Sequence, residues 1–213
     1  MRNKLLLVAF VTLFANAKFE ATISNITPKI KQRMINGNSY RAGCPVPTSR
    51  LNYITLTYIG FDGKEHKGEL IVNKAVTNDV VNIFRELYNI KYPIKKMKLV
   101  SNYNGSDFAS IEADNTSAFN CRFVGSSKRW SKHSYGKAID INPIENPYIT
   151  NSGKIFHKKS YKYITRKHMK KKPSDKAMLI KGDKAIKIFN SYGWIWGGTF
   201  KEAKDLQHFH KIN

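Results

Sequence analysis

Two groups of histidine and carboxylate residues stand out in the second half of the chain. His133 and Asp140 form the first group, and Asp205, His208 and His210 form the second, close to the C-terminus. Neutral imidazole and carboxylate oxygen are ligands of catalytic zinc sites, which use three protein ligands and keep a fourth position open. His133, Asp140 and one C-terminal histidine can supply the ligands, and Asp205 can act as a general base. The residue types thus predict a hydrolytic metal site, with packed or surface histidines as the alternative.

The arrangement of these groups resembles one family of cell-wall zinc peptidases. Residues 131–140 follow the pattern S-x-H-x-x-G-x-A-x-D, and a W-G-G turn at 196–198 precedes D-x-x-H at 205–208. The combination is similar to zinc D-Ala-D-Ala carboxypeptidases, D-Ala-D-Ala dipeptidases and L-Ala-D-Glu endopeptidases. Other segments that look like this family occur in family order over residues 40–213, including 43–46, 66–70, 83–87 and 115–122.

The resemblance implies a role for each residue of the two groups. His133, Asp140 and His208 match the ligands of one Zn²⁺ ion per chain, and Asp205 matches the general base. His210 stands where relatives often have an acidic residue, which is a departure from the family pattern. His208 is the expected ligand, since only this choice leaves the base three residues before it.

Two further residues match positions that handle the substrate in this family. Arg122 matches an arginine that binds substrate and stabilises the oxyanion, a task that suits a permanently charged guanidinium. Ser131 matches a serine that orients the site or contacts substrate. The resemblance implies hydrolysis of peptidoglycan stem peptides through a zinc-activated water, with Asp205 and Arg122 as catalytic residues. The bond cut is D-Ala-D-Ala or L-Ala-D-Glu, and a non-catalytic zinc-containing wall-binding or polyanion-binding protein is the alternative.

The charge and the N-terminus indicate where such a protein acts. The chain has 37 Lys and Arg against 15 Asp and Glu, a net charge of +22, which indicates an anionic partner. Residues 1–17 combine a basic start, a short apolar run and an A-x-A site, as in a cleaved signal peptide. Cleavage removes Arg2 and Lys4, leaves +20, and leaves no transmembrane segment. We expect an exported, periplasmic or secreted monomer whose anionic partners are envelope polymers rather than nucleic acid.

Two other features follow from the sequence. Cys44 and Cys121 are the only cysteines, and one disulfide and two buried free thiols are equally open. Residues 154–172 contain nine Lys and Arg without an acidic residue, which predicts a basic surface loop with a few apolar anchors. The remaining histidines, His66, His157 and His168, have no assigned role.

Strands must position the two groups of site residues. β-Branched and aromatic residues predict strands at 53–59 and 68–72, joined by a turn at Asp62-Gly63. A shorter apolar run predicts another strand at 97–100. Trp194 and Trp196 share one strand face and are expected in the core or the wall of the site.

Helices complete the expected fold. One is predicted to begin at residue 77 or 78, and another covers 181–192 with Gly193 as its stop signal. Polar residues 18–40 are predicted to form an irregular leader before the domain at 41–213. Strands mixed with two to four helices predict a single α+β domain with a small, mainly antiparallel sheet. The family resemblance implies an architecture like that of Hedgehog and the DD-peptidases.

Overall fold

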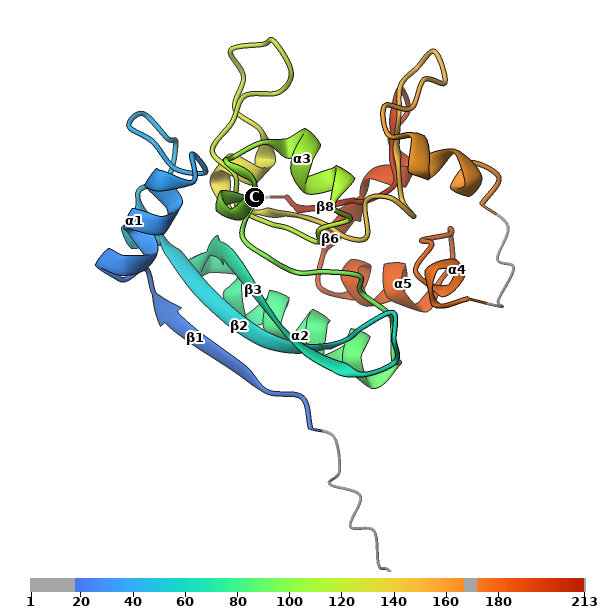
Figure 1. The fold of residues 1–213 in the computed structure, drawn as a ribbon, viewed down its shortest axis with the longest axis horizontal. Coiled ribbons are helices and arrows are strands. Elements are labelled where there is room, and N and C mark those ends of the chain that lie inside the picture. The colour runs from blue at the N-terminus through green and yellow to red at the C-terminus, as the bar shows by residue number, and fades with distance from the viewer. Residues whose placement is uncertain (1–17, 167–171, 213) are drawn as a thin grey trace, which may run out of the picture.

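The computed structural model describes residues 18–166 and 172–212, and a three-stranded antiparallel sheet forms one layer of it (Figure 1). β1 (Ala21–Asn25), β2 (Leu51–Ile59) and β3 (Glu65–Asn73) pair in that order. The β2–β3 register is continuous, and the chain reverses at the predicted turn. Both predicted strands are confirmed. Each is longer than predicted because the ladder continues past the predicted ends, mostly through polar residues.

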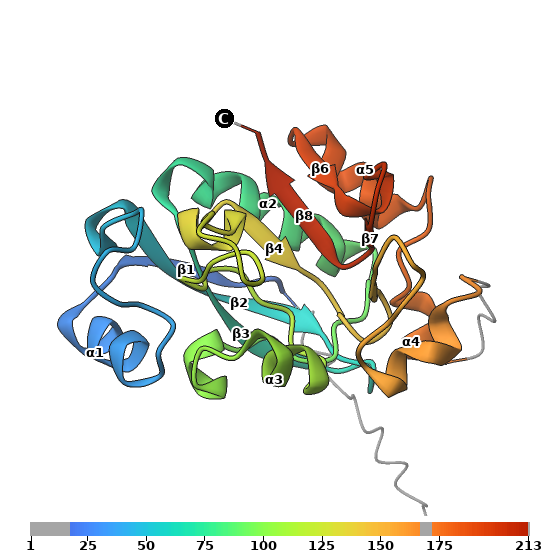
Figure 2. The ribbon, with the colours of Figure 1, turned by 90° about the horizontal axis from the view of Figure 1, so that it is seen from above.

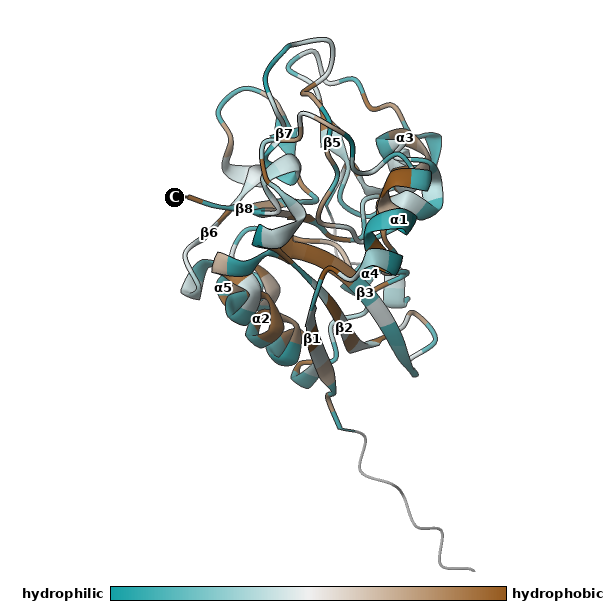
Figure 3. Cartoon of the chain, turned by 90° about the vertical axis from the view of Figure 1, so that its left-hand side faces the viewer, coloured by the Kyte–Doolittle hydropathy of each residue, from teal (hydrophilic) through white to brown (hydrophobic). Residues whose placement is uncertain are grey.

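The two faces of this sheet bury different groups of apolar side chains because residues alternate along a strand. One face packs against α2 (Thr77–Asn89), whose buried residues include Val80, Phe84 and Leu87. The other face packs against α1 (Pro28–Asn36), where Met34 is fully buried. In Figure 3, hydrophobic residues concentrate between the elements and hydrophilic residues cover the outer side of α2.

A second antiparallel sheet contains Asp140 and His208, two of the three residues expected to bind metal. β4 (Ala138–Asp140) and β6 (Trp194–Trp196) flank β8 (His208–Lys211), as Figure 2 shows. The predicted C-terminal helix is confirmed as α5 (Lys184–Ser191), which packs on β6 and α2. Trp194 and Trp196 are buried in the core that joins the two sheets.

Shorter elements lie beside the second sheet. β5 (Tyr148–Ile149) pairs with β7 (Lys204–Asp205), and α3 (Asp107–Glu112) and α4 (Pro173–Lys176) are short helices. The predicted single α+β domain with small antiparallel sheets is confirmed. The described residues contain five α-helices rather than two to four, since α3 and α4 are too short to show a periodic pattern. No helix in this part of the chain is long and apolar enough to span a membrane.

Two expected segments differ from the structure. The leader is not irregular, because β1 pairs with β2 and Thr27 caps α1 ahead of Pro28 at its first turn. Residues 97–100 do not form a strand, and Met97 makes only an isolated bridge to Thr116. Local composition misses both, because β1 is largely exposed and residues 97–100 find no continuous partner strand.

The described part of the basic loop, 154–166 and 172, agrees with the expected surface excursion. It contains a 3₁₀ segment at Lys158–Tyr163 and is anchored by buried Ile155 and Tyr163. Tyr161 and Ile164 are exposed. His168 lies outside the described residues.

Candidate metal centre

A tight turn and two neighbouring strands hold the three expected ligands. His133 lies on a 3₁₀ turn at Lys132–Tyr135, where the Ser131 hydroxyl accepts a hydrogen bond from the His133 backbone N–H at 3.3 Å. Gly136 ends this turn with φ 65°, and a side chain there would collide with the backbone of Asn73. The chain then enters β4, which ends at Asp140. The spacing from His133 to Asp140 therefore reflects one turn followed by one short strand.

The ligand atoms of His133, Asp140 and His208 converge in the interior. One ligand atom from each lies within 4.8 Å of the others, and all three residues are buried. Nε2 of His133 lies 3.2 Å from Oδ2 of Asp140, and Nδ1 of His208 lies 3.0 Å from Oδ1. The two imidazole nitrogens are 3.2 Å apart. The structure thus brings together the three residues predicted to bind metal.

The surroundings of His133 fix which of its nitrogens can bind a metal. Its Nδ1 lies 2.6 Å from the backbone carbonyl of Ala118, which can only accept a hydrogen bond. Nδ1 therefore holds the proton, and Nε2 points its lone pair toward Asp140 and His208. Two imidazole nitrogens and one carboxylate facing a common centre are a donor set that fits zinc.

Charge complementarity holds the ligands in place. Burial opposes ionisation of Asp140, but His133 and His208 outweigh it and hold the pKa of this carboxyl well below its usual range. Burial also opposes protonation of His133, yet the Asp140 carboxylate raises its pKa. The cluster thus binds positive charge strongly, whether as a proton or as a metal cation.

Asp205 lies on β7, opposite Tyr148 of β5 in the register of this small sheet. Its Oδ1 atom is buried and has no hydrogen-bond partner among the described residues. Burial and the nearby Asp140 charge raise the pKa of Asp205 to about 7, against the lowering effect of His208 and His133. A carboxyl with a raised pKa beside a candidate metal site is suited to proton transfer. Gly197 allows the W-G-G turn to pass close to the Asp205 backbone, which a side chain would block.

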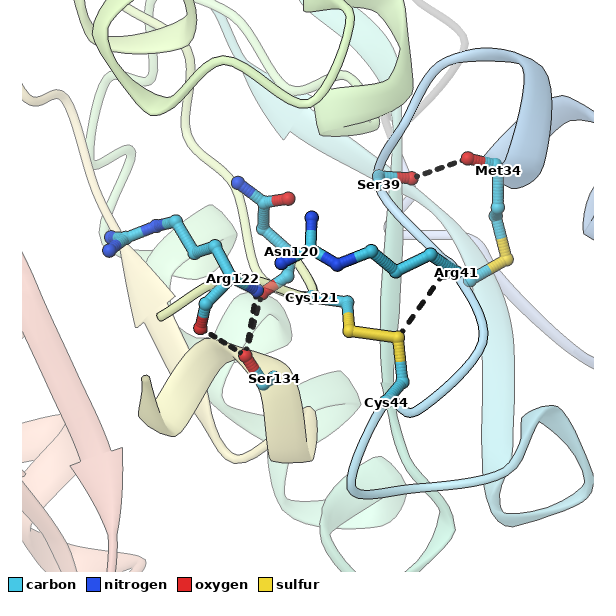
Figure 4. Close-up of a disulfide and its surroundings, with 8 residues drawn as sticks. All are labelled: Met34, Ser39, Arg41, Cys44, Asn120, Cys121, Arg122 and Ser134. Atoms are coloured by element: carbon cyan, nitrogen blue, oxygen red, sulfur yellow. Dashed lines mark hydrogen bonds between the residues drawn. A yellow bond between two sulfur atoms is a disulfide. The ribbon is translucent and has the colours of Figure 1, made fainter. Parts of the chain in front are cut away.

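Arg122 is positioned by an acidic residue that the sequence did not point to. One guanidinium nitrogen, Nη2, lies 2.9 Å from Oδ2 of Asp107 at the start of α3. The Arg122 Nε atom is buried and has no partner among the described residues. Its backbone is held by Ser134, whose hydroxyl contacts Arg122 N and O, next to the Cys44–Cys121 disulfide (Figure 4). Of the two alternatives left open by the sequence, the structure contains the disulfide between Cys44 and Cys121 and not two free thiols.

A cavity of about 800 Å³ connects these groups. All six predicted site residues line it, together with Asp107 and His157. Apolar side chains form most of the remaining wall: Phe108, Ile111, Phe123, Val124, Pro143, Pro147, Tyr148, Ile155, Phe156 and Phe200. The cavity thus brings together a candidate metal site, a carboxyl and a guanidinium. The specific role of each side chain stays a prediction.

The other histidines occupy different environments. The His210 ring lies 5.3 Å from that of His208 on the same strand face, and burial and His208 lower its pKa to about 4. His210 is not part of the three-ligand cluster. His66 is exposed and pairs with Asp62 at the β2–β3 turn. His157 and Asp107 were missed by sequence reasoning because their partners lie far away in the chain.

Comparison with known proteins agrees with this geometry. Residues 125–211 match the sequence model of a family described as D-alanyl-D-alanine carboxypeptidase. The match includes His133, Asp140, Asp205 and His208, while Arg122 lies just before it. Over these residues the match agrees with the family resemblance of the sequence. No curated protein and no solved structure matches the chain.

Proposed function

We propose that this chain, in which residues 125–211 have the sequence pattern of the D-alanyl-D-alanine carboxypeptidase family, is an exported zinc peptidase that hydrolyses peptidoglycan stem peptides. The main support is the convergence of His133, Asp140 and His208 on one wall of a cavity that also contains Asp205. A purely structural zinc site is normally closed by four protein ligands. Three ligands with a buried carboxyl nearby fit a catalytic site better.

The three-residue cluster would hold the zinc ion. Bound zinc supplies Lewis-acid activation of a water molecule and of the peptide carbonyl. Nε2 of His133, Nδ1 of His208 and the Asp140 carboxylate are the atoms that face the common centre. The Ala118 carbonyl keeps His133 in the tautomer that this role requires.

The other polar residues of the cavity would act on the proton and the substrate. Asp205 would accept a proton from the attacking water and return it to the leaving amine, because its buried carboxyl has an oxygen without a partner among the described residues and lines the same cavity. Arg122 donates hydrogen bonds to the carbonyl oxygen as negative charge develops on it, or to a substrate carboxylate. Asp107 holds the guanidinium toward the cavity.

Export and binding to the envelope are part of the same proposal. The Cys44–Cys121 disulfide supports an oxidising compartment. The predicted signal peptide at 1–17 lies outside the described residues. The net charge of +22, or +20 after the predicted cleavage, favours retention near anionic envelope polymers rather than nucleic acid. A binding protein without activity is the alternative, and turnover decides between the two.

Digestion of purified muropeptides tests the proposal. The chain, loaded with zinc, is incubated with pentapeptide stems, and the products are identified by mass spectrometry. Loss of one terminal alanine identifies a D-Ala-D-Ala carboxypeptidase, and release of a stem that begins at D-Glu identifies an L-Ala-D-Glu endopeptidase. A chelator should stop the reaction and added zinc should restore it. Intact substrate in the presence of zinc would refute the peptidase.

A further inference from the structure

His157 forms a second polar site in the cavity that the proposed chemistry does not use. Its Nδ1 lies 2.9 Å from Oε2 of Glu112, the last residue of α3. Glu112 in turn pairs with Lys159, whose Nζ is 2.7 Å from Oε1. The Phe108 ring, one turn earlier on α3, lies against the imidazole with centroids 4.4 Å apart. Glu112 thus holds one edge of the imidazole ring, and Phe108 packs against the ring.

The pairing also fixes which nitrogen remains available. Lys159 and His157 lower the pKa of Glu112, so its carboxylate is ionised and can only accept hydrogen bonds. Nδ1 of His157 must therefore be the donor, which leaves Nε2 as the ring nitrogen that a ligand can contact. No hydrogen bond to Nε2 is formed within residues 18–166 and 172–212. His157 is largely buried and lines the cavity, so Nε2 is the ring nitrogen left for a ligand in the cavity.

Apolar residues line the cavity together with His157, among them Ile111 and Ile155. Phe108 and Phe156 are 58% and 53% exposed, although large aromatic side chains are usually well buried. Exposed aromatic side chains beside a cavity with one oriented polar group are typical of ligand sites. Lys154 and Lys159 disfavour a cationic ligand here, which leaves a neutral donor such as a peptide N–H.

We propose that His157 and the aromatic pair Phe108 and Phe156 form a second substrate subsite, which binds the stem peptide away from the bond that is cut. Nε2 of His157 accepts a hydrogen bond from a backbone N–H, and the two rings cover alkyl side chains. This inference rests on the proposed peptidase function. It implies that long stems bind better than short ones, and that His157 accounts for much of the difference.

The test compares His157→Leu with wild type on two substrates, a pentapeptide stem and the shortest peptide that contains the cleaved bond. KM for the pentapeptide should rise about 3- to 10-fold, as expected for one lost hydrogen bond, with kcat nearly unchanged. KM for the short peptide should stay the same. Glu112→Gln should also raise KM for the pentapeptide. His66→Leu is the matched control, because His66 also pairs with a carboxylate, 2.9 Å away, but outside the cavity.

A binding measurement separates this inference from the peptidase proposal. Pentapeptide affinity is measured by calorimetry in Asp205→Asn, with and without His157→Leu. A loss of pentapeptide affinity when His157→Leu is added supports the subsite, even if the wild-type protein cleaves nothing. The absence of cleavage by wild type would refute only the peptidase proposal. Unchanged affinity, or an equal KM rise for both peptides, overturns the subsite. If His157→Leu does not fold, Phe108→Ala at its exposed position serves the same comparison.

Discussion

Asp140 lies directly opposite His208 where β4 pairs with β8, and its two carboxylate oxygens face two different imidazoles. Oδ1 contacts His208 at 3.0 Å, and Oδ2 lies 3.2 Å from His133. The register of one antiparallel pair thus places two candidate ligands side by side, and the turn before β4 adds the third.

This relationship predicts how zinc binding responds to substitution. Asp140→Asn keeps the size of the side chain but removes the negative charge between the imidazoles. Zinc content after dialysis, measured by mass spectrometry, should fall from about one ion per chain to near zero. His210→Gln should keep its zinc, because His210 lies outside the cluster. Full zinc content in Asp140→Asn would contradict the assigned ligands.

Asp205 should affect turnover without affecting the metal. Asp205→Asn cannot accept a proton, so kcat should fall by about 10²- to 10⁴-fold. Zinc content should remain at the wild-type level, since the carboxyl is not one of the three converging ligands. Activity is followed on muropeptides by mass spectrometry. Hydrolysis at the wild-type rate would remove Asp205 from the mechanism.

The Asp107–Arg122 pair predicts a graded loss of activity. Arg122→Ala should lower kcat/KM by about 10²- to 10³-fold through loss of the oxyanion donor. Arg122→Lys should not restore it, because one ammonium group cannot contact Asp107 and substrate as the planar guanidinium can. Asp107→Asn should cost less, mainly through KM, and Asp107→Glu should recover part of the loss. A neutral effect of Asp107→Asn would show that the pair does not position the guanidinium.

The disulfide should stabilise the fold around Arg122. Cys44 and Cys121 are separated by 77 residues in sequence, and loop closure of that length corresponds to about 4 kcal/mol. Cys44→Ala/Cys121→Ala should lower the free energy of unfolding by about this amount in a urea titration. A reducing agent should destabilise wild type similarly and leave the double variant unchanged. Equal stability of both proteins without reductant would argue against the bridge.

A buried carboxyl pair away from the metal predicts a pH-dependent stability. Burial and the neighbouring Asp114 raise the pKa of Glu145 to about 9, and its Oε2 has no partner among the described residues. In the unfolded chain, a glutamate has a pKa of about 4.3. Between these values the folded state binds the extra proton, so stability is greatest at the acidic end and falls as pH rises, by up to about 1.4 kcal/mol per pH unit.

Thermal unfolding from about pH 5 to about pH 9 checks this sign. Glu145→Gln mimics the protonated side chain and should become more stable relative to wild type as pH rises. Glu202→Gln, at an exposed position, should follow the wild-type curve. If the curve of Glu145→Gln also runs parallel to wild type, Glu145 is ionised in the folded protein.

Local patterns were sufficient for the main elements of the fold. The β2–β3 pair, α2 and α5 follow from alternation, periodicity and a strong turn signal, which act between near neighbours. β1 and α1 were missed because β1 presents mostly exposed side chains and depends on β2 for its hydrogen bonds. Residues 97–100 were assigned a strand because their composition favours one, but no continuous partner lies beside them.

For the site, the sequence by itself determined the candidate metal ligands and the candidate base. His133 and Asp140 lie on one turn and the strand that follows it. Asp205 is separated from His208 by a single tight turn. Only the tertiary structure decided that the two segments face each other across the β4–β8 register. It also decided that Asp107 holds Arg122, that Glu112 orients His157, and that Cys44 meets Cys121. The partners in each of these pairs are far apart in the chain. Their contact depends on how the core packs rather than on any local spacing.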